Sequence, residues 1–227
     1  MNPVLAIDHL VVGATSLAEG EAWCEAVLGV TPVGGGKHGL MSTHNRLLNL
    51  SGPGFPRCYL EIIAIDPDAP PPGRKRWFDL DDAAVQERLR LQGPGLIHWV
   101  ARVDGDLDEQ LSEWRQRGID AGEALAASRM TPTGELRWRI ALRADGRRLA
   151  QGAVPLLIEW GEVHPADALP PSGVTLQQFS LRMPQPGLLS EFAAEPGSAM
   201  LEVRLQSPLG LVSLGLVTSK TSSDEPS

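Results

Sequence analysis

The chain has 227 residues, of which 42% are hydrophobic and 21% charged, and its formal net charge is −8. This composition is typical of a globular protein with one large core or two small ones. The acidic balance, without a basic tract, excludes nucleic acid as an expected partner. No apolar run reaches the roughly 18 residues that a membrane-spanning helix needs, so no membrane partner is expected. With two cysteines and no charged-then-apolar leader, a cytoplasmic location is expected.

Residues 1–66 form the first predicted unit. Val4–Val12 is a β-branched apolar run that indicates a buried strand. Ser16, with Glu19 three residues later, predicts the capped start of a helix, and Gly29 predicts its end. Three further strands are expected at 31–34, 40–50 and 57–66. The unit is therefore β-α-β-β-β.

The same order of elements returns in residues 96–162, the second predicted unit. A connector, residues 67–95, joins the two; it is rich in proline at first and helical from Asp81 to Gln92. A strand at 96–103 and a helix at 107–117 precede three strands at 121–125, 135–143 and 153–161. Self-similarity of this kind predicts a duplicated architecture.

The rest of the chain, residues 163–217, reads as a partial third unit of β-α-β-β type that closes a sheet edge or covers a sheet face. Residues 218–227 are small and polar and predict a disordered tail. The fold class is α+β. Duplicated β-α-β-β-β units are expected to form curved mixed sheets with helices on the outer face.

Each unit offers one histidine in its opening strand and one glutamate in its closing strand. These are His9 and Glu61 in the first unit, and His98 and Glu159 in the second. A lone carboxylate in an apolar strand is costly to bury unless it is paired or binds a metal. A pseudo-twofold arrangement would gather all four side chains around one divalent cation. The alternatives are core histidines with salt-bridged glutamates, or an empty pocket lined by the same residues.

A second group of candidates consists of polar residues inside strand-like runs. His44, Asn45 and Arg46 interrupt the apolar pattern before Leu47, and buried polar groups of this kind need a ligand or each other as partners. Arg139 falls roughly where Arg46 falls in the first unit, so both are expected to border the cavity and bind substrate. The alternative for Arg139 is an ion pair with Glu61 or Glu159.

Several segments carry a family resemblance. Ile7–Val12, Ser42–Leu47 and Tyr59–Glu61, with 134–139 and 155–160 in the second unit, resemble the glyoxalase-like domain group. This group belongs to the vicinal oxygen chelate superfamily, which includes glyoxalase I. The resemblance implies a metal held by His9, Glu61, His98 and Glu159, with Glu159 as the catalytic base. It also implies proton abstraction next to a carbonyl, giving an enediolate that the metal stabilises.

The predicted function is a metal-dependent lyase or isomerase that acts on a small oxygenated substrate. Zinc, nickel, manganese and iron all suit a mixed His/Glu set. A dioxygenase of the same superfamily is disfavoured because it needs two histidines and one glutamate within one unit, and the second unit offers only His98 before Glu159. A non-catalytic small-molecule binding protein is the alternative. The long connector allows the two units to pair within one chain, whereas pairing across a homodimer remains the other arrangement.

Overall fold

A computed structural model of the chain describes residues 4–131 and 134–216. The strands are β1 Val4–Gly13, β2 Val33–His38, β3 Thr43–Asn49, β4 Tyr59–Ile65, β5 Gly95–Asp104, β6 Glu123–Thr131, β7 Gly134–Leu142, β8 Leu156–Trp160, β9 Thr175–Met183, β10 Glu195–Pro196, β11 Met200–Ser207 and β12 Gly210–Gly215. The helices are α1 Leu17–Leu28, α2 Ala83–Gln92, α3 Leu107–Gln116 and α4 Pro165–Ala168, with 3₁₀ turns at Leu149–Gly152 and Pro186–Phe192. The predicted tail, 218–227, lies outside the described residues.

The two predicted units stand side by side in one sheet of order β2-β3-β4-β1-β5-β8-β7-β6. In each unit the opening strand pairs in parallel with the closing strand, β1 with β4 and β5 with β8, while β1 and β5 join the units antiparallel. Local signals work as predicted in α1, where the Ser16 side chain accepts a hydrogen bond from the Glu19 backbone and Gly29 adopts a left-handed conformation. The duplicated β-α-β-β-β fold is confirmed.

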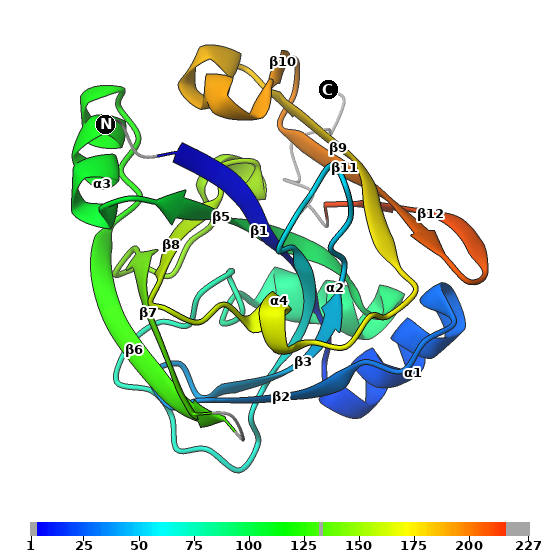
Figure 1. Cartoon of the computed structure of the whole chain (residues 1–227). Coiled ribbons are helices and arrows are strands. Elements are labelled where there is room, and N and C mark those ends of the chain that lie inside the picture. Colours follow the sequence, from blue (N-terminus) through cyan, green and yellow to red (C-terminus); the bar gives the residue numbers. More distant parts are fainter. Residues whose placement is uncertain (1–3, 132–133, 217–227) are drawn as a thin grey trace, which may run out of the picture.

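This large sheet is curved so strongly that its two edge strands approach each other. Figure 1 shows β2 and β6 converging at the bottom of the view, although they are the first and last strands of the sheet. Arg129 on β6 closes the gap by donating a hydrogen bond from Nη1 to the Gly35 carbonyl on β2, at 3.0 Å. The curvature gives the sheet a concave inner face and a convex outer face.

The outer face is covered by α1, α3 and the C-terminal strands, which share one apolar cluster with it. A separate four-stranded sheet, of order β10-β9-β11-β12, packs over the centre of the large sheet. Trp99 of β5 is fully buried there, with its ring edge-on to Phe179 and Phe192 at centroid distances of 4.7 and 4.8 Å. The partial third unit therefore covers a face of the sheet, and its helical part is a 3₁₀ turn.

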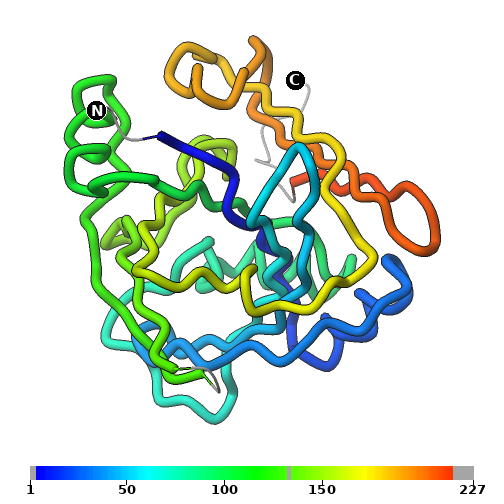
Figure 2. Tube along the Cα trace, viewed as in Figure 1, coloured from blue at the N-terminus to red at the C-terminus, as the bar shows by residue number. Residues whose placement is uncertain are grey.

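The inner face is filled from one end by the connector. Trp77 and Phe78, together with Val85 and Leu89 of α2, pack in a second apolar cluster against Val11 and its neighbours. At the other end the chain from residue 163 crosses the mouth of the curved sheet in yellow (Figure 2). There α4 is attached to β3, because Asn49 Nδ2 donates hydrogen bonds to the carbonyls of Ala166 and Leu169, at 3.4 and 3.2 Å. The inner face, the connector and α4 thus enclose a space at the centre of the fold.

No helix among the described residues is long and apolar enough to cross a membrane.

Candidate functional site

Two β-bulges at the junction of the units set the direction of the site side chains. The antiparallel pairing of β1 with β5 slips at Asp8, between Ile7 and His9, and again at Ile97. A bulge places one extra residue on a strand and so changes which face the following side chains occupy. As a result Ile7 packs against the outer cluster, whereas Asp8 and His9 both point to the inner side.

Asp8 is fully buried and accepts hydrogen bonds from three side chains. His9 Nδ1 donates to Oδ1 at 2.5 Å, while His164 Nε2 and Trp160 Nε1 donate to Oδ2 at 2.8 and 2.9 Å. Burial by itself would raise the pKa of Asp8, but the bonds from His164 and His9 hold that pKa well below its usual range. Asp8 is therefore a stable buried carboxylate.

The same bonds fix the proton positions on the two histidines. His164 Nδ1 accepts the Ala166 backbone N–H at 3.1 Å, so its proton sits on Nε2, facing Asp8. His9 uses Nδ1–H for Asp8, so Nε2 is the ring nitrogen that faces away from Asp8. That atom lies 3.7 Å from Glu61 Oε2, and the ring stacks on Tyr59 at a centroid distance of 4.5 Å.

A second network surrounds the other oxygen of Glu61. Asn45 accepts the Gly36 backbone N–H at Oδ1, at 2.8 Å, so its amide nitrogen faces the opposite way. That nitrogen donates to Glu61 Oε1 at 2.6 Å and lies 3.2 Å from His38 Nε2. His38 therefore accepts at Nε2 and donates from Nδ1 to Thr43 Oγ1, at 3.0 Å.

His38, like His9, directs its Nε2 atom towards Glu61. Its Nε2 lies 3.8 Å from Glu61 Oε1. Burial lowers the pKa of His38 to about 4, against a smaller opposing effect of Glu61. The ring is therefore neutral at pH 7.

The three side chains His9, His38 and Glu61 border one cavity of about 40 Å³. This is room for a metal ion or a water molecule. The rest of the lining is mainly aromatic and aliphatic, formed by Trp77, Phe78, Leu136, Trp138, Ile140, Ile158, Trp160 and Pro165. Arg129 also lines the cavity. The histidines and the carboxylate of this cavity all come from the first unit.

Strand register explains why the second unit contributes no carboxylate. The pairs His9–Val100 and Val11–His98 are mirror images, so the pseudo-twofold relates His9 to His98 and Val11 to Val100. Val11 pairs with Glu61 on β4, and Val100 pairs with Leu156 on β8. The counterpart of Glu61 is therefore Leu156.

The predicted convergence of Glu159 with the other three residues is wrong. Glu159 lies three positions beyond Leu156, and an odd offset places a side chain on the opposite face of a sheet. It faces α3, where Oε2 accepts the Leu107 backbone N–H at 2.8 Å and the Arg139 guanidinium at 3.2 Å. Its predicted roles as metal ligand and catalytic base are not supported by this position.

His98 points to the inner side but is shut off from the cavity. Phe78 lies over its ring at a centroid distance of 5.3 Å, and His98 is not among the residues that line the cavity. Its neighbours are apolar because Ile97 occupies the place that Asp8 has in the first unit. Burial, aided by Arg148, lowers the pKa of His98 well below 6.5, against a smaller opposing effect of the Gly152 backbone. Neither ring nitrogen has a well-formed hydrogen bond among the described residues.

Of the four predicted substrate-binding residues, only Asn45 reaches the cavity. Arg46 lies on the outer face, where it forms an ion pair with Glu21 of α1. His44 shares that face by alternation, and its Nδ1 is 3.9 Å from Asp66 Oδ1. Arg139 is also outside, paired with Asp108 and Glu159. The expectation that His44, Arg46 and Arg139 border the cavity is therefore wrong.

Three residues of the site had no assigned role from the sequence. Asp8 had the clearest signal, because a carboxylate inside a buried strand needs strong partners. His38 closes the glycine-rich strand β2 without any periodicity that would predict its direction. Arg129 comes from the far edge of the sheet, and only closure of the curve brings it to this cavity.

The donor atoms suit a divalent cation, although they are not drawn together around one. Among the described residues no three His, Cys, Asp or Glu side chains already stand in a metal-binding group. Donors bound to one zinc-sized ion are about 3.4 Å apart in a tetrahedral site. The 3.7 and 3.8 Å separations from Glu61 to His9 and His38 exceed this by a few tenths of an ångström. The two distances end on different oxygens of Glu61, Oε2 for His9 and Oε1 for His38, so these three side chains would have to shift to share one cation. His98 and Glu159 do not line the cavity at all.

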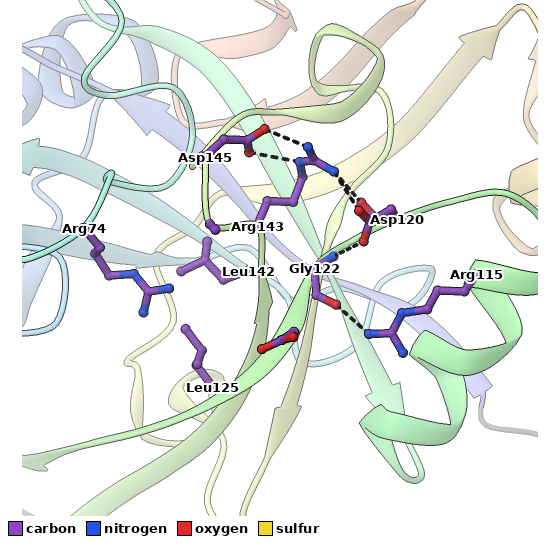
Figure 3. Close-up of a pocket in the computed structure, with 10 residues that line it drawn as sticks. Arg74, Arg115, Asp120, Gly122, Leu125, Leu142, Arg143 and Asp145 are labelled. Atoms are coloured by element: carbon purple, nitrogen blue, oxygen red, sulfur yellow. Dashed lines mark hydrogen bonds and ion pairs between the residues drawn. The ribbon is translucent and has the colours of Figure 1, made fainter.

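A larger pocket, of about 480 Å³, lies beside α3 and the ends of β6 and β7 (Figure 3). Its charged side chains mostly satisfy each other: Arg143 pairs with Asp120 and Asp145, and Arg115 donates to the Gly122 carbonyl. It contains none of the predicted site residues. The inner cavity, which gathers His9, Asn45 and Glu61 of the predicted residues, is the candidate for the chemistry of this protein.

A curved sheet of paired β-α-β-β-β units around a polar cavity defines the class of fold. A family profile described as "Glyoxalase-like domain" matches residues 7–197. The chain therefore belongs to the glyoxalase-like domain family, in the vicinal oxygen chelate superfamily. No functionally curated protein matches the sequence.

Solved structures resemble the chain at low sequence identity. A hypothetical protein from Staphylococcus aureus is 12% identical, with a TM-score of 0.56, over 96% of this chain and 88% of that chain, and it shares the overall fold. Methylmalonyl-CoA epimerase from Streptomyces coelicolor, in complex with 2-nitronate-propionyl-CoA, is 18% identical, with a TM-score of 0.43, over 70% and 96% of the two chains. The Mycobacterium tuberculosis epimerase is 18% identical, with a TM-score of 0.39, over 72% and 91%.

Proposed function

We propose that this protein is an isomerase or lyase that moves a proton next to a carbonyl of a small oxygenated substrate, with a divalent cation held by His9, His38 and Glu61. The observation that carries the proposal is the pair of imidazole Nε2 atoms that face one carboxylate at the inner cavity. Two neutral imidazoles and a carboxylate are good ligands for zinc, nickel, manganese or iron.

The residues behind the ligands support this role. His9 donates a hydrogen bond from Nδ1–H to Asp8, and His38 donates one from Nδ1–H to Thr43. Metal-bound histidines in proteins nearly always have such partners, which fix the tautomer and the direction of the ring. A bound cation would polarise the substrate carbonyl and stabilise an enediolate.

Glu61 is the proton acceptor that this cavity offers. Its Oε1 is held by Asn45, whereas no hydrogen bond reaches Oε2 among the described residues. Glu61 therefore takes the role that the family resemblance assigned to Glu159. The aromatic wall of Trp77 and Trp138 excludes water from the proton transfer.

Elemental analysis of protein purified without chelator tests the cation. We expect about one divalent ion per chain, and about a tenfold or greater loss of retained metal in Glu61→Gln. Glu159→Gln is the matched control, because it removes the same charge on the other face of the sheet. Equal metal content in both variants, or none in the native protein, would contradict the assignment.

The reaction is tested by incubating hemithioacetals and related α-hydroxy carbonyl compounds with the protein in D₂O and following exchange of the α-proton by NMR. We expect the native protein and Glu159→Gln to catalyse exchange of the α-proton, and Glu61→Gln not to catalyse it. If metal is retained and no compound exchanges, the binding-protein alternative takes its place.

A second candidate is a dioxygenase, favoured by one observation. His9, His38 and Glu61 all belong to the first unit, and two histidines with one carboxylate on one side of a metal are the ligand set of non-haem iron(II) oxygenases. Iron as the retained metal, with oxygen uptake on addition of a catechol, would select this function over the isomerase.

A further inference from the structure

We propose that the substrate is a carboxylic acid with an apolar tail, whose carboxylate is held by Arg129 and whose tail lies in the groove outside the inner cavity. The inference rests on the proposed function, because it extends the same cavity outward to a substrate site. It concerns a different group of residues, and it can be tested by binding alone.

The groove has a volume of about 370 Å³ and adjoins the inner cavity, since Arg129, Leu136 and Pro165 line both. The inner cavity, of about 40 Å³, is too small for an organic substrate, whereas the groove has the size of a small-molecule site. Its walls are largely aliphatic: Val33, Leu47, Leu136, Val163, Ala168 and Leu169. A substrate whose reacting end lies at the inner cavity therefore has the rest of its structure in the groove, and that part must be apolar to match the groove walls.

Arg129 is the one cationic side chain at the place where groove and cavity meet, among the residues that the structure describes. Its guanidinium makes a single hydrogen bond, from Nη1 to the Gly35 carbonyl, and no described carboxylate lies within ion-pair distance. By contrast, the one carboxylate of the groove, Glu135, is already paired with Arg137. A guanidinium with free N–H groups next to a cavity is suited to a carboxylate, which it can hold through two parallel bonds.

The glycines of β2 allow the guanidinium to stand at this position. A Cβ atom on Gly36 would come within 2.3 Å of Arg129 Nη1, and the chain has glycine there. Any other residue would push the guanidinium away from the junction. The close approach of β2 and the arginine is therefore built into the sequence of the first unit.

Charge balance also favours an anionic substrate. The cavity and its supporting residue contain two carboxylates, Glu61 and Asp8. A divalent cation together with Arg129 brings three positive charges against these two negative ones. One positive charge is left, which a monoanionic substrate neutralises in a site with little access to water.

Ligand-observed NMR titrations of the full chain with hexanoate, 1-hexanol and acetate test the proposal. Hexanoate should bind about tenfold or more tightly than 1-hexanol, which lacks the charge, and than acetate, which lacks the tail. In Arg129→Gln the advantage of hexanoate over 1-hexanol should fall to about twofold or less, while 1-hexanol binding stays the same. Arg139→Gln, on the outer face, should leave both affinities unchanged.

The proposal is overturned by equal binding of hexanoate and 1-hexanol, by a hexanoate preference that survives in Arg129→Gln, or by no binding of either compound to the native chain. If Arg129→Gln binds neither hexanoate nor 1-hexanol, the arginine has a purely structural role and the proposal is rejected. In that case Arg129→Lys, which keeps the charge, must also bind neither compound. Repeating the titration in Glu61→Gln separates the two proposals. If the native protein holds no metal and catalyses no exchange but still prefers hexanoate, only the proposed reaction is rejected. If it holds metal and catalyses exchange but shows no hexanoate preference, only the Arg129 site is rejected.

Discussion

Replacing Asp8 by asparagine should reverse the tautomer of His9. The variant keeps the shape of the side chain but turns one acceptor oxygen into an NH₂ donor. Trp160 Nε1 can only donate, and His164 must donate from Nε2 because its Nδ1 accepts Ala166 N–H. The amide oxygen of the Asp8→Asn side chain is therefore committed to these two, and its NH₂ group faces His9 Nδ1. His9 must then accept at Nδ1 and carry its proton on Nε2.

The cost in stability follows from the same three hydrogen bonds. Bonds to a charged acceptor contribute about 1.5–3 kcal/mol each, and neutral ones about 0.5–1.5 kcal/mol. Converting three bonds from charged to neutral should lower the free energy of unfolding by about 3 kcal/mol. In the cavity, the lone pair of His9 Nε2 is replaced by an N–H directed at Glu61, so the proposed cation loses a ligand.

Two measurements check this prediction. Long-range ¹H–¹⁵N NMR of the imidazole nitrogens distinguishes the tautomers, and urea unfolding gives the change in stability. Asp104→Asn is the matched control, since Asp104 is an exposed partner of Arg102 and should change stability by no more than about 0.5 kcal/mol. The reasoning is refuted if His9 in the Asp8→Asn variant keeps its proton on Nδ1, or if the variant is as stable as the native protein.

Three further predictions concern the surroundings of the site. Because His98 is buried without a well-formed hydrogen bond among the described residues, His98→Leu should raise the free energy of unfolding by about 1–2 kcal/mol at about pH 7.5. The pKa of His98 is lowered on folding, so the stability of the native protein falls as the pH drops below 6.5. The gain in stability from leucine should therefore be larger at about pH 5 than at about pH 7.5. Urea unfolding at both pH values measures this gain, and a variant less stable than the native protein would contradict the prediction. Gly35→Ala would place a Cβ atom 2.0 Å from Asn45 Oδ1 and 2.5 Å from the Asn45 carbonyl oxygen, so it should lower the free energy of unfolding by about 2–4 kcal/mol. A Cβ atom on Gly34 meets nothing within 4 Å, so Gly34→Ala should lower it by less than about 0.5 kcal/mol. Similar unfolding midpoints for the two variants would contradict this packing. Burial raises the pKa of Cys24 to about 12 and that of Cys58 further, so neither thiol should react with Ellman's reagent at about pH 8 until the chain is unfolded; rapid labelling of the native protein would show that the core opens there.

Sequence patterns were sufficient for the units but not for the face of each glutamate. Glu61 and Glu159 both lie near the end of an apolar strand, and their neighbours in the sequence look alike. The face of the sheet that a side chain occupies depends on how its strand is paired. Val100 pairs with Leu156, three residues before Glu159, so Glu159 lies on the opposite face from Leu156. Nothing in the sequence of β8 alone gives that partner.

Bulges are the second feature that periodicity does not reveal. Strict alternation predicts that Asp8 and His9 point to opposite faces, yet both point inward because Asp8 is the extra residue of a bulge. The bulge is a property of two paired strands, because it arises where β1 has one residue, Asp8, without a counterpart in β5.

The sequence by itself determined the duplication and the order of strands and helices in the two units, and it named His9, Asn45 and Glu61 among the candidate site residues. These follow from local hydrophobic periodicity and from repetition within the chain. Tertiary structure decided which unit carries the site: Phe78 from the connector covers His98, Glu159 faces α3, and closure of the sheet brings His38 and Arg129 to the cavity. Such placements depend on pairing between distant segments, where a shift of one residue exchanges the inner face for the outer one.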